Sequence, residues 1–295
     1  MNRINVTFVP KMLHSQHTMI YISDEANMRF QVLVSTMNQP DHRLVEKMKL
    51  NSDAIIINQC NQLAVDCQEH NGFLIHWYSF NERGIGLSRN NALMRAEADI
   101  VLFADDDVTY AENYRKIILE EFRNFPGADV IVFNVPSTNV ERPEFIDRRV
   151  HRLHWYNCLR YGAFRIAVRL DKVRKKNILF HQMFGGGARY GCGEDSIFLA
   201  DCLKNGLKLY ASPKTIGHVS HGESSWFTGY DKKYFRDKGA LFTCICERLA
   251  MPLAFQYCFR HREVLDQLSM REAMYWMYQG SRDFKQTETN RRGGN

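Results

Sequence analysis

The first half of the chain alternates short apolar runs with amphipathic stretches. The apolar runs are rich in Val, Ile and Phe, which is typical of strands buried on both faces of a parallel sheet. They cover residues 30–36, 53–59, 73–79, 100–104 and 129–135. The amphipathic stretches predict helices over residues 39–50, 86–98 and 114–125. Strands that alternate with helices indicate an α/β fold with a mainly parallel sheet flanked by helices.

The second half of the chain has a different character. A basic and aromatic segment, residues 141–176, precedes a glycine-rich loop at 185–193. The loop leads into a predicted helix that ends near Gly206. A strand is predicted over residues 207–213, and helices over 234–284. The polar residues 285–295 predict a disordered tail.

The composition fits a globular protein, because 45% of the 295 residues are hydrophobic. The net charge of +6 suits anionic substrates or an anionic membrane surface and does not require a nucleic-acid partner. The eight cysteines form no CxxC pair, so they indicate reduced thiols rather than a zinc site or a disulfide framework. No signal peptide or membrane-spanning run is recognisable. We therefore expect a cytoplasmic location, with contact to the inner face of the cytoplasmic membrane left open.

Three consecutive aspartates, Asp105 to Asp107, directly follow the apolar run at residues 100–104. Adjacent carboxylates repel one another unless a cation or hydrogen-bond donors offset their charge. Ligands of open α/β sheets bind outside the carboxyl ends of the strands, and carboxylate oxygens suit Mg²⁺ or Mn²⁺. An acidic turn that caps the next helix explains the same residues without a ligand. The run alone does not decide between these explanations.

Glu194 and Asp195 follow the glycine-rich loop at the start of the next predicted helix. Free backbone N–H groups there stabilise an ionised carboxylate, and an ionised Asp beside a loop can act as a general base. The simpler alternative is a helix cap formed by Asp195 or Ser196, with Glu194 in solvent. For the earlier helix, Ser88 is the candidate N-cap.

The order of these motifs resembles that of the family-2 glycosyltransferases of the GT-A fold, particularly bacterial members that build capsule, exopolysaccharide or O-antigen. A strand that ends in Ser35 and Thr36 is followed by "RGIGLSRNNAL", "ADDD" and "GCGEDSIFL". The stretch "ESSWFTGYDKKYFRDKGALF" is also typical of these members. The resemblance implies a Rossmann-like sheet with the parts 1–29 (extension), 30–135 (nucleotide-sugar half), 136–233 (acceptor half) and 234–284 (C-terminal helices).

The resemblance also implies roles for individual residues on the donor side. It assigns Asp107 to a divalent metal, Mn²⁺ or Mg²⁺, that bridges the donor diphosphate. Some members add a metal-binding His, and both His218 and His221 are candidates here. It assigns contacts with the nucleotide sugar to Ser35, Thr36, Asn58, Arg89, Asn90, Asp105 and Asp106. Asn58 stands where many members have an acidic residue, which puts recognition of uracil in doubt.

On the acceptor side, the resemblance makes Asp195 the catalytic base and Glu194 its acceptor-binding neighbour. Gly187 and Trp226 are further candidates for the acceptor site. The basic and aromatic segment would suit an acceptor linked to a lipid diphosphate, because aromatic faces stack on sugars and Arg binds phosphate. A solvated helix with a Trp in the core is an equal alternative. The C-terminal helices either lie on a membrane surface or pack on the catalytic domain, and we favour packing.

Together these features predict an inverting, metal-dependent glycosyltransferase. The predicted donor is a UDP-sugar that provides a hexosyl or N-acetylhexosaminyl group. The predicted acceptor is a saccharide or a polyprenyl-diphosphate-linked saccharide in surface polysaccharide synthesis. A nucleotidyltransferase and an inactive sugar-nucleotide-binding protein are the alternatives. The first lacks support because "STMNQPDHR" is not a glycine-rich loop, and the intact acidic motifs argue against the second.

Overall fold

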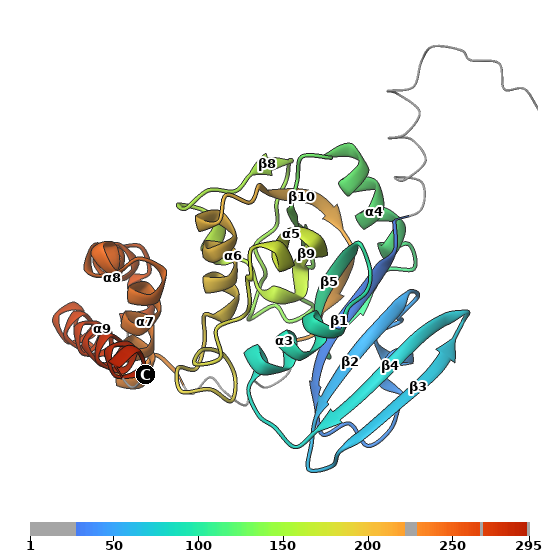
Figure 1. The fold of residues 1–295 in the computed structure, drawn as a ribbon. Helices are drawn as coiled ribbons and strands as arrows, with labels where there is room; N and C mark the ends of the chain where they lie inside the picture. The colour runs from blue at the N-terminus through green and yellow to red at the C-terminus, as the bar shows by residue number, and fades with distance from the viewer. Residues whose placement is uncertain (1–27, 222–228, 266–267, 294–295) are drawn as a thin grey trace, which may run out of the picture.

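The computed structural model describes residues 28–221, 229–265 and 268–293 (Figure 1). A mixed nine-stranded sheet has the strand order β3-β4-β2-β1-β5-β9-β7-β10-β8. Its strands are β1 (Phe30–Met37), β2 (Asp53–Gln59), β3 (Ala64–His70), β4 (Phe73–Phe80), β5 (Ile100–Asp105), β7 (Val130–Asn134), β8 (His151–Arg152), β9 (Ile166–Arg169) and β10 (Leu209–Thr215). A second, two-stranded sheet pairs β6 (Val108–Tyr110) with β11 (Gly217–Val219).

The predicted parallel core of the sheet is confirmed. β4, β2, β1 and β5 are parallel neighbours, and β9 runs antiparallel between β5 and β7. Ser35 pairs with Asp105, and Thr36 pairs with Asn58. The register therefore brings the polar carboxyl ends of β1, β2 and β5 to one edge of the sheet, which is the usual ligand position in such folds.

Helices cover both faces of the sheet. The α-helices are α2 (Leu44–Lys47), α3 (Ile85–Arg95), α4 (Tyr114–Asn124), α5 (Leu170–Lys175), α6 (Glu194–Lys204), α7 (Lys232–Ile245), α8 (Ala250–Arg260) and α9 (Met270–Gly293). Four short 3₁₀-helices in the described ranges are η1 (Cys158–Arg160), η2 (Ala163–Arg165), η3 (Glu247–Leu249) and η4 (Arg262–Leu265). One buried core contains side chains of α2 and α4, and the other contains side chains of α3, α5 and α6. Side chains of β5 alternate between the two cores, as expected for a strand buried on both faces.

Two predicted helices differ from those in the structure. α2 is much shorter than the predicted stretch, because Asp41 accepts a hydrogen bond from the backbone of Arg43 in a local turn and Lys49 adopts a positive φ of 54°. α3 has Gly84 as its N-cap, so the prediction of Ser88 as N-cap is wrong. Ser88 lies inside the helix, and its hydroxyl donates to Ser35 Oγ at 2.9 Å.

The edge strand β3 was not predicted. It forms a hairpin with β4 through Asn71 and Gly72, which have positive φ values of 53° and 81°. β3 is mostly exposed, so it lacks the apolar run by which the buried strands are recognised. The Asn-Gly pair is nevertheless a hairpin signal, because both residues tolerate the left-handed conformation.

The C-terminal helices α7, α8 and α9 form a bundle beside α6 (Figure 1). α7 and α9 approach closely at two glycines: a Cβ at Gly239 would lie 1.9 Å from Met277 O, and a Cβ at Gly280 would lie 1.8 Å from Arg236 O. Ile197 of α6 and Leu241 of α7 share one buried cluster, which confirms that the C-terminal helices pack on the α/β domain. Within the described ranges, none of the helices has the length and apolar character needed to cross a bilayer.

The predicted disordered tail is wrong over residues 285–293, because α9 continues to Gly293. Lys285 forms an ion pair with Glu247 at 3.0 Å, and Thr287 accepts a hydrogen bond from Arg189 at 3.2 Å. These contacts tie the polar end of the helix to the body of the protein. All eight cysteines are free thiols, as predicted. Residues 1–27 of the predicted N-terminal extension lie outside the described residues.

Candidate active site

Arg89 connects the two acidic motifs. Its Nη2 donates to Asp105 Oδ1 at 2.8 Å, and its Nη1 donates to Glu194 Oε1 at 2.7 Å. The Arg89 side chain is 4% exposed. Burial by itself would lower the pKa of Arg89, but the charges of Asp105 and Glu194 outweigh burial and raise it. A permanent positive charge therefore holds the end of β5 against the start of α6.

Thr36 and Asp106 form the next layer of the site. The Thr36 hydroxyl donates to Asp106 Oδ2 at 2.5 Å, and Gln39 Nε2 donates to Thr36 Oγ1 at 2.9 Å. Ser35 is buried, and its Oγ accepts a hydrogen bond from the hydroxyl of Ser88 in α3. The structure thus brings Ser35, Thr36, Arg89, Asp105 and Asp106 together at the sheet edge where a nucleotide sugar was predicted.

Two predicted nucleotide-contacting asparagines hold backbone segments in place. Asn58 Oδ1 accepts from Gln39 N at 3.0 Å, and Asn58 Nδ2 donates to Gln39 O at 3.1 Å. Asn90 makes the same kind of pair with the backbone of Phe180, with both distances 2.8 Å. Both side chains are buried. These contacts favour a role in which the asparagines shape the site.

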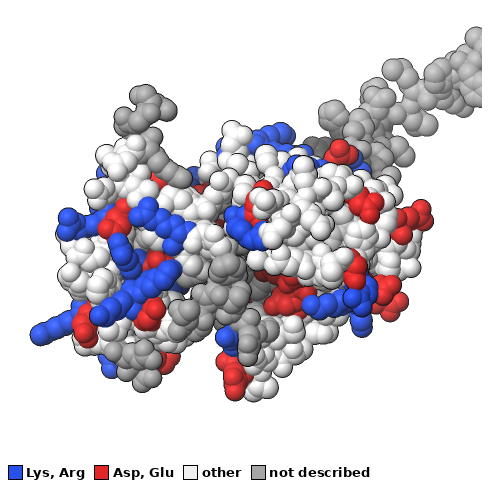
Figure 2. Space-filling model, turned by 90° about the horizontal axis from the view of Figure 1, so that it is seen from below, with Lys and Arg blue, Asp and Glu red and all other residues white. Residues whose placement is uncertain are grey.

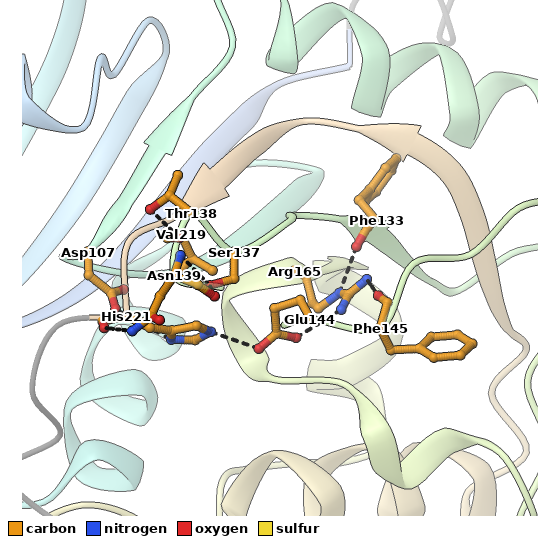
Figure 3. Close-up of polar contacts among 10 residues, drawn as sticks. All are labelled: Asp107, Phe133, Ser137, Thr138, Asn139, Glu144, Phe145, Arg165, Val219 and His221. Atoms are coloured by element: carbon orange, nitrogen blue, oxygen red, sulfur yellow. Dashed lines mark hydrogen bonds and ion pairs between the residues drawn. The ribbon is translucent and has the colours of Figure 1, made fainter. Parts of the chain in front are cut away.

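Asp107 is a carboxylate whose charge is poorly balanced. Burial raises its pKa to about 6, and the neighbouring charges of Asp105 and Asp106 add to this effect, although His221 opposes it. His221 Nδ1 lies 3.9 Å from Asp107 Oδ2 (Figure 3). The two segments are fixed to each other because Ser220 N donates to Asp107 O at 3.1 Å. A bound cation would offset the excess negative charge here.

His221 is oriented by a chain of charged partners (Figure 3). Its Nε2 lies 2.8 Å from Glu144 Oε1, and Glu144 Oε2 lies 3.2 Å from Arg165 Nη1. Arg165 is fully buried and donates to the backbone carbonyls of Phe133 and Phe145, both at 2.8 Å. A carboxylate can only accept, so Nε2 carries the proton in this contact. In the neutral ring, the Nδ1 lone pair then faces Asp107.

Of the two candidate histidines, only His221 lies next to Asp107. His218 is exposed on β11, pairs with Thr109 and lines a separate cavity together with Lys49 and His70. Successive side chains of a strand point to opposite faces, so His218 lies on the face of β11 opposite to the buried Gly217 and Val219. The prediction of His218 as a metal ligand therefore finds no support in the geometry.

Asp107 and His221 fit a cation that takes its remaining ligands from a substrate. In the described part of the chain, there is no cluster of three or more His, Cys, Asp or Glu side chains arranged to hold a metal ion. Mg²⁺ is commonly held by one or two protein ligands together with phosphate oxygens and water. A carboxylate and an imidazole also suit Mn²⁺.

Asp195 lies in the first turn of α6. Burial raises its pKa to about 7, and Glu194 adds to this effect while Arg89 opposes it. The N-cap of α6 is Gly193, without a side-chain cap, and Glu194 is buried. The alternative is wrong in placing Glu194 in solvent, but Asp195 Oδ1 does accept the backbone N–H of Ser196 at 2.6 Å, as a capping side chain would. A carboxyl group with a pKa near neutrality is suited to accept a proton.

The glycine-rich loop beside Asp195 is a folded turn. Gly185 N donates to Tyr190 O at 2.8 Å, and Tyr190 N donates to Met183 O at 2.9 Å. Gly191 N donates to Asp237 of α7 at 2.8 Å. Gly187 is exposed at the tip of this turn. Trp226, the other candidate for the acceptor site, lies outside the described residues.

Glu144 and Arg165 were not recognised in the sequence. Glu144 lies 77 positions before His221, and a short motif cannot report such a contact.

The charges on the face seen in Figure 2 are unevenly distributed. Asp and Glu gather in a recess near the centre, and Lys and Arg prevail on the side of the C-terminal helices.

The sequence matches the profile of glycosyl transferase family 2 over residues 42–189. Residues 1–349 of S. aureus TarS in complex with UDP-GlcNAc are similar in structure, with a TM-score of 0.59, 14% identity, and coverage of 91% of this chain and 93% of that chain. The UDP complex of the same protein gives a TM-score of 0.60 at 14% identity, with coverage of 91% and 92%. No curated protein sequence matches significantly. At these identities, the structural likeness shows the shared fold.

Proposed function

The chain belongs to glycosyl transferase family 2 and has the GT-A fold, and from that premise we propose that it transfers a sugar from a nucleotide-sugar donor to a saccharide acceptor with inversion. The observation that carries this proposal is the bridge made by Arg89. It joins Asp105, at the predicted donor edge, to Glu194, the neighbour of the predicted base Asp195. One charged side chain thus holds the two halves of the site together.

A UDP-sugar is the proposed donor. Support comes from the two similar TarS structures, which are described as complexes with UDP-GlcNAc and UDP. In this chain, Thr36, Asp105 and Asp106 would contact the nucleotide sugar. Asn58 and Asn90 would act by holding the backbone of the site, as their hydrogen bonds indicate.

Asp107 and His221 would hold Mn²⁺ or Mg²⁺. When bound, such a cation would supply positive charge to offset the charge that develops on the leaving diphosphate. The pKa of Asp107, raised to about 6, and the orientation of His221 by Glu144 support this assignment.

Asp195 would remove the proton from an acceptor hydroxyl group. The acceptor oxygen then forms a bond to the anomeric carbon from the face opposite the leaving group. The bond from the anomeric carbon to the diphosphate oxygen breaks, and its electron pair leaves with the nucleotide diphosphate. One in-line displacement inverts the anomeric configuration. Glu194 is fixed by Arg89 and would orient the acceptor.

The proposed acceptor is a saccharide, free or linked to polyprenyl diphosphate, in the synthesis of a surface polysaccharide. The proposed donor group is a hexosyl or N-acetylhexosaminyl residue. Contact with a membrane surface would accompany a lipid-linked acceptor. The basic and aromatic residues between 141 and 176 support an acceptor of this kind.

The test is a screen of UDP-sugars for slow release of UDP in the presence of Mn²⁺ without acceptor. We expect hydrolysis of one UDP-sugar above the buffer rate, and we expect Asp107→Ala to abolish it. The melting temperature with UDP and Mn²⁺, compared with that with CTP or ATP, distinguishes a glycosyltransferase from a nucleotidyltransferase. Stabilisation by CTP or ATP but not by UDP would contradict the proposal and favour a nucleotidyltransferase.

A further inference from the structure

A cavity of about 560 Å³ adjoins the candidate active site. Its lining comes from the segment around η1, the start of α6, and the helices α7 and α8. Three of the lining side chains, Arg160, Lys238 and Arg260, are cationic, and the lining contains no Asp or Glu. We propose that this cavity binds the phosphate-bearing part of a lipid-linked acceptor, with Lys238 as a phosphate contact. The proposal rests on the function proposed above.

Lys238 is the cation best placed for this role. It is partly buried on α7, with its ammonium 5.5 Å from the ring centroid of Tyr234 and 5.4 Å from that of Tyr257. Among the described residues, no carboxylate lies within ion-pair distance of it. A partly desolvated ammonium is stabilised by an anionic or hydrogen-bonding partner. A phosphate group supplies both the charge and the acceptor oxygens.

The position of the cavity fits an acceptor site. Ser196, which follows the proposed base Asp195, lines the cavity. Its hydroxyl donates to the carbonyl of Leu159, another lining residue, at 3.3 Å. The wall of the cavity is thus built on the same turn of α6 that carries Asp195. An acceptor whose phosphate lies at Lys238 would have its sugar close to the base.

The remaining lining suits a ligand with both apolar and sugar parts. Leu241, Phe242 and Ile245 of α7 and Leu253 of α8 form an apolar wall. Trp155, which is 48% exposed, offers an aromatic face at the rim. A hydrocarbon chain gains stability by packing on the apolar wall, and the cationic side chains bind phosphate favourably. A neutral saccharide alone would leave Lys238 without an anionic partner.

The experiment measures the binding of farnesyl diphosphate by calorimetry to the full chain, after UDP and Mn²⁺ have been bound and free metal has been removed. With the donor site filled, we expect binding to the wild type. We expect Lys238→Met to weaken it about tenfold or more, since a hydrogen bond to a charged group is lost. Lys238→Arg should retain most of the affinity. Inorganic pyrophosphate, the second probe, should bind more weakly than farnesyl diphosphate.

Lys232→Met is the matched control. Lys232 lies on the same helix, has its ammonium 5.6 Å from the ring of Trp276, and does not line the cavity. Unchanged affinity in Lys238→Met, or no binding to the wild type, would overturn the proposal. Equal affinity for pyrophosphate would overturn its lipid part. UDP binding, measured first, tests the proposed function separately, because the donor site does not depend on Lys238.

Discussion

Arg89 Nη1 lies 2.7 Å from Glu194 Oε1, although the two residues are 105 positions apart in the sequence. The same guanidinium contacts Asp105 at 2.8 Å, so it sits between carboxylates from both acidic motifs. Without this cation, the carboxylates of Asp105 and Glu194 would repel one another across the site. Arg89 therefore stabilises the fold and also sets the charge around Asp195.

Replacing Arg89 should destabilise the protein. Arg89→Met leaves Asp105 and Glu194 without their cation, and breaking a buried ion pair by removal of one partner costs about 3–5 kcal/mol. Urea unfolding monitored by circular dichroism would measure the free energy of unfolding. Arg83→Met, at an exposed position just before α3, should change it by no more than about 0.5 kcal/mol. Equal stability of the two variants would show that the bridge is energetically unimportant.

Asp195→Asn should lower turnover by about 10²- to 10⁴-fold, which is the usual contribution of general-base catalysis. The affinity for UDP should stay the same, because the amide keeps the shape of the carboxyl group. Initial rates and calorimetry with UDP would measure the two effects. Turnover near the wild-type value would exclude Asp195 as the base.

The wild-type enzyme should lose activity as the pH falls through about 7. Burial and the charge of Glu194 raise the pKa of Asp195 to about 7. A base must be unprotonated to act, so the rate is full above this pKa and declines below it. A profile of kcat/KM against pH would show the decline. A profile that stays flat from pH 8 to pH 5.5 would contradict the assignment.

The buried strands and the two acidic motifs could be predicted because each signal is local. The run before Asp105 is apolar without interruption, and its side chains enter both cores. The chain leaves the core where the aspartates begin, so the position of the site followed from the end of β5. β3 escaped prediction for the opposite reason, since a polar edge strand has no apolar run.

The metal-binding side of the site could not be resolved from the sequence. The choice between His218 and His221 depends on contacts just after β11, where Ser220 N donates to Asp107 O and His221 Nδ1 lies 3.9 Å from Asp107 Oδ2. The contact of His221 with Glu144 depends on the buried Arg165, which is anchored by distant backbone carbonyls. Such contacts arise from tertiary packing, and a single sequence carries no local signal for them.

Asp107→Ala should remove the metal-dependent part of UDP binding. Calorimetry of UDP with and without Mn²⁺ would give the two affinities, and they should become equal in the variant. In the wild type, Mn²⁺ competes with a proton for a carboxyl group whose pKa is raised to about 6. Mn²⁺-dependent binding should therefore weaken as the pH falls below about 6. A variant that still gains affinity from Mn²⁺ would rule out Asp107 as a ligand.

Glu144→Gln tests whether the orientation of His221 matters for the metal. The amide can still accept a hydrogen bond from Arg165, so the fold should persist. The variant lacks the carboxylate that lies 2.8 Å from His221 Nε2 in the wild type. Both the tautomer and the basicity of the His221 imidazole are therefore less well fixed. Loss of such a partner typically costs about 10- to 100-fold in metal affinity. Titration of Mn²⁺ by electron paramagnetic resonance, with UDP present, would measure it.

Glu141→Gln is the control for this variant. Glu141 lies in the same segment but is exposed, and no contact of its side chain with His221 is seen in the described structure. Its replacement should leave the Mn²⁺ affinity unchanged, and both variants should melt near the wild-type temperature. If Glu144→Gln bound Mn²⁺ as tightly as Glu141→Gln, the contact between Glu144 and His221 would have only a structural role. A weakened Mn²⁺ affinity without a change in melting temperature would show that Glu144 positions the metal ligand His221.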